Sequence, residues 1–164
     1  EIINQAKKIS RWGNNIFVKV PVINTKGKFL KKVIKYLNND KIKLNITAVF
    51  TLKQISDIKK NINKTTPVII SIFCGRIADI GIDPEPIVTK TKSMFKNYKN
   101  VKVLWASVRE VYNFYQAKKT NCDIITVQPS LIKKIRSKKI TPKKYSINTV
   151  EQFFSDGRKS KFKL

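Results

Sequence analysis

The sequence has no histidine, which removes the most common general base and every nucleophile system that depends on an imidazole. Glycine is scarce, with 5 residues among 164, and none of them forms the glycine-rich phosphate loop of nucleotide-binding folds. The two cysteines, Cys74 and Cys122, have neither metal-site nor disulfide-framework spacing, so we expect a reducing, cytoplasmic location. No apolar run is long enough to predict a membrane span.

Acidic residues are also scarce, with 10 against 35 basic ones, which gives a net charge of +25. The basic residues are 30 lysines and 5 arginines, and isoleucine (24) and asparagine (14) are abundant too, as AT-rich codon usage would produce. The charge is therefore weak evidence for nucleic-acid binding, and no zinc-finger, helix-turn-helix or RNA-binding motif supports it. Its positive field would still attract phosphorylated metabolites.

The chain is 41% hydrophobic, and its 164 residues predict a single domain over residues 1–164, or part of a larger one. Five β-rich runs predict strands at 16–22, 42–47, 68–73, 101–107 and 123–127. Helical signals separate them: an apolar face of Leu30, Val33, Ile34 and Leu37, capping boxes at Thr51/Gln54 and Ser107/Glu110, an N-cap at Asp83 before Pro84, and a last helix with Ile147, Val150 and Phe154. This alternation predicts a parallel sheet with helical crossovers.

Two architectures fit such a pattern, an open doubly wound sheet and a (β/α)8 barrel. The open sheet usually carries a glycine-rich loop after an early strand, and this chain has none. The barrel places its chemistry on inward-facing residues at the carboxyl ends of several strands. The period of two along each strand therefore predicts which residues could share a site.

One lysine, Lys19, lies between Val18 and Val20 in a run that is typical of a strand buried on both faces. The side opposite the helices is predicted to hold Phe17, Lys19 and Pro21, then Asn45 and Thr47, then Ser71 and Phe73, then Val103, Trp105 and Ser107. Thr47 or Ser71 alone would be an ordinary core hydroxyl. Because polar residues gather there on consecutive strands, we expect a site. A lysine amine attacks a carbonyl only when neutral, which a dry pocket favours, and the resulting Schiff base supports C–C cleavage without a cofactor or metal.

The stretches VKVPV (18–22), KLNITAVFTLKQ (43–54), ISIFCGRIADIG (70–81), LWASVRE (104–110) and CDIITV (122–127) resemble the transaldolase family, which includes the fructose-6-phosphate aldolases. The resemblance covers nearly the whole chain, in order. It implies a (β/α)8 barrel in which Lys19 forms a Schiff base with dihydroxyacetone from a ketose phosphate. It also implies sugar phosphate substrates, no cofactor, a role in carbohydrate metabolism such as the pentose phosphate pathway, and compatibility with a homo-oligomer.

The resemblance also assigns roles around that lysine. Asn45 would hydrogen-bond a hydroxyl of the dihydroxyacetone unit, and Thr47 would hold the water that relays protons. Ser71 would contact the substrate, and Phe73 would pack close to the imine. In the aldolase branch the position of Phe73 is tyrosine, so its phenylalanine favours transfer over release of free dihydroxyacetone.

The phosphate of the sugar would be held by Arg76, Ser107 and Arg109. Two guanidinium groups can chelate phosphate oxygens. A helix beginning at Ser107 would add free N–H groups and its positive dipole end, although Ser107 could equally be a plain N-cap.

The chain departs from the family in its strand number, because five strands are present where the family has eight, and the first one resembles the family's fourth. The family's first strand supplies an Asp and its third a Glu or Gln, and neither region is in this sequence, which starts with Glu1 rather than Met. We therefore expect an N-terminally incomplete, C-terminal portion of a barrel with little or no activity as given. The expected activity of the complete protein is transaldolase, with a fructose-6-phosphate aldolase-type lyase as alternative and a basic nucleic-acid-binding protein as a remote one.

Overall fold

The computed structural model describes residues 1–137 and 140–160. Its centre is a parallel sheet of five strands in the order β1-β2-β3-β4-β5, so every strand pairs with its neighbour in the chain. The strands are β1 (Val18–Pro21), β2 (Leu44–Val49), β3 (Val68–Ile72), β4 (Val101–Trp105) and β5 (Ile124–Ile125). A doubly wound sheet reverses its strand order, whereas a (β/α)8 barrel keeps it sequential. The predicted fold class, a five-stranded portion of a barrel-type α/β fold, is confirmed.

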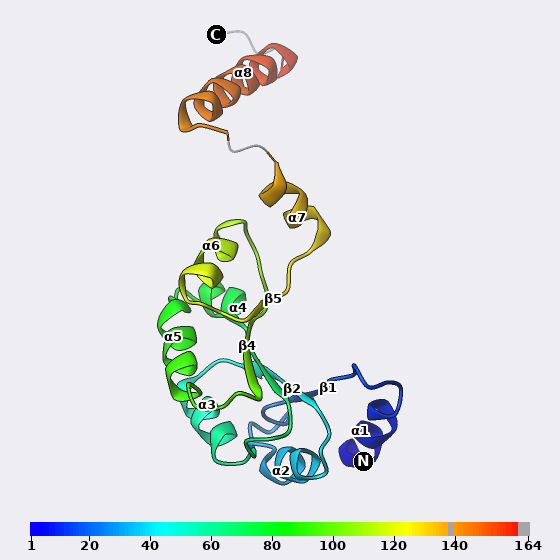
Figure 1. Cartoon of the computed structure of the whole chain (residues 1–164). Helices are drawn as coiled ribbons and strands as arrows, with labels where there is room; N and C mark the ends of the chain where they lie inside the picture. Colours follow the sequence, from blue (N-terminus) through cyan, green and yellow to red (C-terminus); the bar gives the residue numbers. More distant parts are fainter. Residues whose placement is uncertain (138–139, 161–164) are drawn as a thin grey trace.

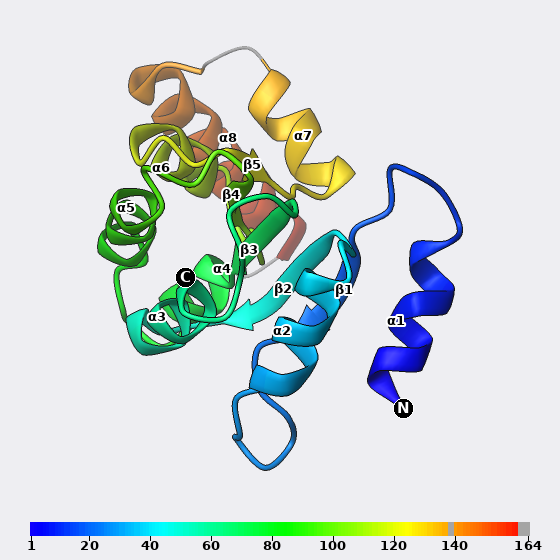
Figure 2. The same ribbon diagram turned by 60° about the horizontal axis from the view of Figure 1, so that its bottom comes forward.

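The helices are α1 (Ile2–Ser10), α2 (Lys31–Asn39), α3 (Leu52–Lys59), α4 (Cys74–Asp79), α5 (Glu85–Met94), α6 (Tyr112–Lys119), α7 (Pro129–Arg136) and α8 (Pro142–Ser160). Figure 1 shows α2, α3, α5 and α6 on one side of the sheet, α1 beside the β1 end, and α7 and α8 beyond the β5 end. Turned by 60°, Figure 2 again separates α1 from the layer of crossover helices. Over the described ranges no helix has both the length and the apolar character needed to cross a membrane.

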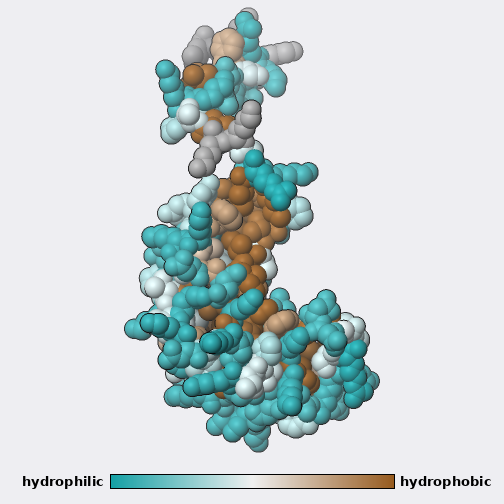
Figure 3. All heavy atoms as spheres, viewed as in Figure 1, coloured by the Kyte–Doolittle hydropathy of each residue, from teal (hydrophilic) through white to brown (hydrophobic). Residues whose placement is uncertain are grey.

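The hydrophobic core lies between the crossover helices and one face of the sheet. Val18 and Val20 of β1 are buried there, together with Ile34 and Leu37 from the predicted apolar face of α2. The other face of the sheet is open, and a hydrophobic band follows the sheet in Figure 3 while the helical exterior is mostly hydrophilic. The five strands thus have one face packed against the crossover helices and a second face that these helices do not cover.

The predicted helix start at Thr51 is confirmed, whereas α5 begins one residue later than predicted, with Pro84 rather than Asp83 at the cap position. The Thr51 hydroxyl accepts a hydrogen bond from Gln54 N at 3.2 Å, and Gln54 Oε1 accepts one from Thr51 N at 3.1 Å, so this capping box is complete. The Asp83 carboxylate accepts a hydrogen bond from Glu85 N at 2.9 Å, directly where α5 begins. Both contacts satisfy N–H groups that the first turn of a helix leaves free.

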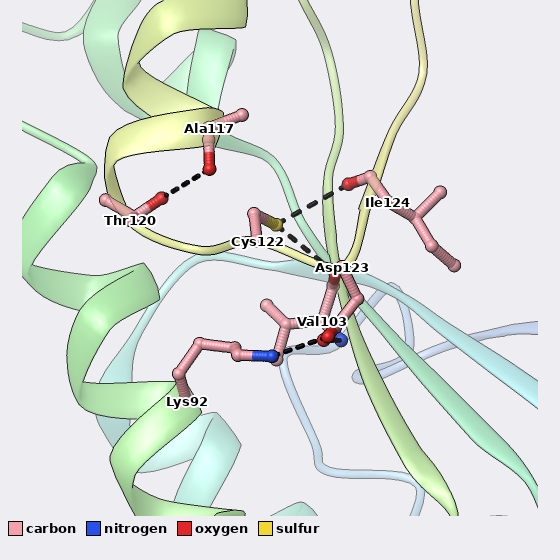
Figure 4. Close-up of polar contacts among 7 residues, drawn as sticks. All are labelled: Lys92, Val103, Ala117, Thr120, Cys122, Asp123 and Ile124. Atoms are coloured by element: carbon pink, nitrogen blue, oxygen red, sulfur yellow. Dashed lines mark hydrogen bonds and ion pairs between the residues drawn. The ribbon is translucent and has the colours of Figure 1, made fainter.

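The last strand, β5, is only two residues long, and a side chain extends its pairing with β4. Figure 4 shows Asp123 between the two partners of its carboxylate: Oδ2 accepts a hydrogen bond from Val103 N at 2.7 Å, and Oδ1 pairs with Lys92 Nζ at 2.5 Å. The Cys122 thiol donates to Val103 O at 3.2 Å. Asp123 therefore ties β5 both to β4 and to helix α5.

Candidate active site

The proposed nucleophile, Lys19, lies on the open face of β1. Val18 and Val20 point to the helices and are buried, whereas Lys19 is exposed, so the predicted alternation is confirmed. The prediction that this strand is buried on both faces is wrong for the described chain. The physical reason is that β1 is an edge of an open sheet, whose free face is not closed into a barrel interior.

Two polar residues from the next strands lie close to this position. Lys19 and Asn45 are register partners in the β1–β2 pair, so their side chains leave the sheet on the same face. The Ser71 hydroxyl, which is 2% exposed, donates a hydrogen bond of 2.6 Å to Asn45 Oδ1. The register thus places an amine, an amide and a hydroxyl on the same face of three consecutive strands, as the period of two along the strands predicts.

Thr47 lies on the same face, one step further toward the carboxyl end of β2. It is 9% exposed, and its Oγ1 has no hydrogen-bond partner among the described residues. Directly after it, β2 contains a bulge: the register shifts between Ile46 and Val49, and Ala48 has a φ of 57°. Bulges and strained backbone recur next to functional sites because they redirect side chains. A buried hydroxyl without a partner fits a residue that holds a water or a substrate oxygen.

Phe73 and Arg76 lie together just after β3. Phe73 is half-buried and packs its ring against Phe50, with centroids 5.6 Å apart. The guanidinium of Arg76, on helix α4, lies over the Phe73 ring at 5.3 Å, within the range of a cation–π contact. Phe73 therefore supports one of the two arginines that the resemblance assigns to the phosphate.

The prediction for the fourth strand assigns its side chains to the wrong faces of the sheet. Val103 and Trp105 pair in register with Ile70 and Ile72, belong to the hydrophobic core and face the helices. The residues of β4 on the open face are therefore the alternate ones, including Leu104, which pairs with Ser71. Because alternate residues of a strand point to the same face of the sheet, the pairing of one residue determines which face every residue of the strand points to.

The predicted helix start at Ser107 is also wrong. Ser107 has a φ of 63°, in the left-handed region, and α6 begins only at Tyr112. The Asn113 carboxamide, in the first turn of α6, instead accepts hydrogen bonds from two residues upstream of the helix, from Arg109 N at 2.9 Å and from Glu110 N at 3.3 Å. Ser107 therefore offers no helix N-terminus to a phosphate, and the groups that the resemblance assigns to it are the Ser107 hydroxyl and the two arginine side chains.

A close contact between the backbone of α4 and the backbone of the loop after β4 fixes the position of this loop. A Cβ atom on Gly75, in the first turn of α4, would lie 1.6 Å from the carbonyl oxygen of Ser107 and 3.0 Å from Cγ of Arg109. Arg109 itself pairs with Asp79 at the end of α4, with Nη2 and Oδ2 2.9 Å apart. Sequence reasoning missed Gly75, Asp79 and Asn113. The only local signal was an asparagine inside an expected helix, where it is unfavourable.

The thiols near the site are not available as nucleophiles. Burial raises the pKa of Cys74 far above its ordinary value, and burial also raises the pKa of Cys122 to about 11. Both therefore stay protonated at neutral pH. In the part of the chain that the structure describes, no group of three or more acidic, cysteine or histidine side chains lies close enough to hold a metal ion.

Comparisons with known proteins identify the family. The family model described as "Transaldolase/Fructose-6-phosphate aldolase" matches residues 1–163. The chain is 32% identical over 142 residues to a "Probable transaldolase" of Nitrosopumilus maritimus (strain SCM1), covering 85% of this chain and 60% of the relative. It is 28% identical over 144 residues to "Probable transaldolase 2" of Listeria monocytogenes, covering 87% of this chain and 62% of the relative. It is 29% identical over 165 residues to a "Probable transaldolase" of Chelativorans sp. (strain BNC1), covering 100% of this chain and 70% of the relative. The chain thus spans about 60–70% of the length of these curated relatives, and it belongs to the transaldolase/fructose-6-phosphate aldolase family.

Proposed function

We propose that residues 1–164 form one domain, a five-stranded portion of a transaldolase barrel, in which Lys19 is the Schiff-base lysine. The observation that supports this most is the cluster on the open face: Lys19 beside Asn45 in register, and Asn45 hydrogen-bonded to Ser71. Membership of the family supplies the chemistry that such a cluster can perform. The substrates are sugar phosphates.

The proposed reaction begins when the neutral amine of Lys19 adds to the C2 carbonyl of a ketose phosphate. Loss of water gives an imine, and cleavage of the C3–C4 bond releases an aldose phosphate while its electron pair passes to the imine and leaves an enamine on Lys19. The enamine carbon then attacks an acceptor aldehyde, and water hydrolyses the new imine to free the product ketose. In the alternative lyase reaction the enamine is protonated and hydrolysed, so that free dihydroxyacetone leaves.

The other residues of the cluster would position and stabilise these intermediates. Asn45, fixed by Ser71, would hydrogen-bond a hydroxyl of the three-carbon unit. Thr47, whose Oγ1 lacks a partner among the described residues, would hold the water that transfers protons. The phosphate would bind to Arg76 and Arg109, since guanidinium groups make bidentate contacts with phosphate.

Borohydride trapping tests the assignment of Lys19 in the protein expressed from its complete gene. Reduction with borohydride and a ketose phosphate should attach a three-carbon adduct to Lys19, detected by peptide mass spectrometry. Lys102 is a matched control, because it is also an exposed lysine on the open face of the sheet. Its register partner is Ile69, and Ile69 in turn pairs with Asn45. Lys19→Ala should abolish the adduct and Lys102→Ala should leave it. An adduct spread over many lysines, or one that survives Lys19→Ala, would refute the proposal.

A further inference from the structure

The loop after β4 is held in place by one buried side chain. Asn113 is 3% exposed, and its Oδ1 accepts the hydrogen bonds from Arg109 N (2.9 Å) and Glu110 N (3.3 Å). Its Nδ2 donates to Gln116 Oε1 at 3.0 Å, which fixes the orientation of the carboxamide. A buried amide whose two ends are both used defines one conformation of the loop, because any other would leave polar groups unpaired.

The side chain of Arg109 is held at two further points. Gly75 leaves room for its Cγ, since a Cβ at that position would lie 3.0 Å from it. At the far end, Asp79 Oδ2 lies 2.9 Å from Arg109 Nη2. The backbone, stem and guanidinium of Arg109 are therefore each restrained by a different partner, two of them on helix α4.

The Asp79–Arg109 pair is poorly suited to a purely structural role. The two side chains are 48% and 53% exposed, and ion pairs as accessible as this one contribute little to folding stability. Asp79 uses one nitrogen of a guanidinium that has five N–H donors, so the others stay free for an anion. A guanidinium that is already oriented loses less conformational freedom when it binds than a free one does.

We propose that Asp79 and Asn113 are positioning residues for phosphate recognition, which hold Arg109 in the geometry that binds the phosphate of the sugar. This rests on the proposed function, in which Arg109 contacts that phosphate. Freezing one long side chain on binding weakens affinity by about 2- to 12-fold. Removal of the Asp79 restraint should therefore raise the dissociation constant for phosphate by a factor in this range.

The first test uses inorganic phosphate as the probe, so that it does not depend on turnover. Titration of the complete protein should shift the Nε–H resonance of Arg109 in ¹H–¹⁵N spectra, and Asp79→Asn should weaken the apparent affinity about 2- to 12-fold. Asp40→Asn is the matched control, because it removes another accessible ion pair, Lys7–Asp40 at 3.1 Å, whose side chains are 35% and 46% exposed. It should leave the affinity unchanged. No shift at Arg109, or an unchanged or tighter affinity in Asp79→Asn, would overturn the proposal.

The second test follows the backbone. Asn113→Ala should speed amide hydrogen exchange at Arg109 and Glu110, and Asn113→Asp, which keeps the acceptor oxygen, should restore their protection. Protection that survives Asn113→Ala would remove Asn113 from the proposal.

The third test is kinetic. Asp79→Asn should raise KM for a ketose phosphate about 2- to 12-fold, with kcat and the KM for unphosphorylated dihydroxyacetone unchanged. Equal changes for both substrates would refute positioning at the phosphate. If the unmodified protein binds phosphate at Arg109 but does not turn over ketose phosphates, the proposed function fails while this inference stands.

Discussion

Gly75→Ala is the substitution whose effect follows most directly from the structure. The N–H of Gly75 donates to Ala106 O at 3.3 Å, so α4 lies directly against the backbone that follows β4. A Cβ would be 1.6 Å from Ser107 O and 2.7 Å from Ser107 C. Carbon–oxygen contacts begin at about 3.3 Å, so one of the two segments has to move by roughly 1.7 Å.

The energetic cost comes from the fact that the obstacle is backbone rather than a side chain that can rotate. Inserting a methyl group into a packed contact usually costs about 1–3 kcal/mol, and we expect about 3 kcal/mol here. For a chain of this size that corresponds to a fall of about 6–12 °C in Tm. Thermal unfolding followed by far-UV circular dichroism measures it.

Gly157→Ala provides the control, because Gly157 lies in helix α8 and a Cβ there would meet nothing within 4 Å. That substitution should leave stability unchanged or raise it by up to about 1 kcal/mol through helix propensity. Gly75→Ala should also shift Arg109 and raise KM for a ketose phosphate. If Gly75→Ala is as stable as the unmodified protein, the loop is not packed on α4 as described, and the positioning of Arg109 loses its basis.

Four further outcomes follow from the same geometry. Phe73→Tyr should raise the release of free dihydroxyacetone without an acceptor by about 100-fold or more, because a phenol can protonate the enamine; a rapid release by the unmodified protein would favour the lyase instead. Arg76→Ala should raise KM for phosphorylated sugars more than for dihydroxyacetone, and an equal rise would remove it from the phosphate site. Asp123→Ala should cost roughly 1–3 kcal/mol in urea unfolding, because Val103 N loses its acceptor. Cys122, with a pKa of about 11, should be alkylated slowly at pH 8 until the protein is denatured, since about one thiol in a thousand is ionised there.

The sequence predicts the local part of this fold well, because local signals are enough for it. The alternation of Val18, Lys19 and Val20 correctly separates the two faces of β1, since one face is apolar and the other is not. The capping box of Thr51 and Gln54 is likewise a contact between residues three apart. Neither prediction needs information about distant parts of the chain.

The wrong predictions concern features that only distant contacts decide. In β4 only Lys102 marks the open face, and the three residues after it are all apolar, so pairing with β3 is what shows that Leu104 rather than Val103 shares that face. The Ser107/Glu110 pattern matches a capping box, but the close approach of Gly75 and the Asn113 carboxamide hold that segment in another conformation. Where two local patterns are equally good, packing against another segment selects between them.

The spacing of the candidate site shows how the chain could build it without any sequence repeat. Lys19, Asn45 and Ser71 fall at equivalent places of three successive βα units, 26 residues separating Asn45 and Ser71. Yet the register pairs Asn45 with Ile69, so Ser71 lies one step further toward the carboxyl end than Asn45, and its hydroxyl reaches the amide diagonally. This stagger is what tilted strands of a barrel produce. Because successive residues of a strand alternate between its faces, deleting one residue within β3 ahead of Ser71 would turn the Ser71 hydroxyl to the core, and the hydrogen bond that orients Asn45 beside Lys19 would be lost.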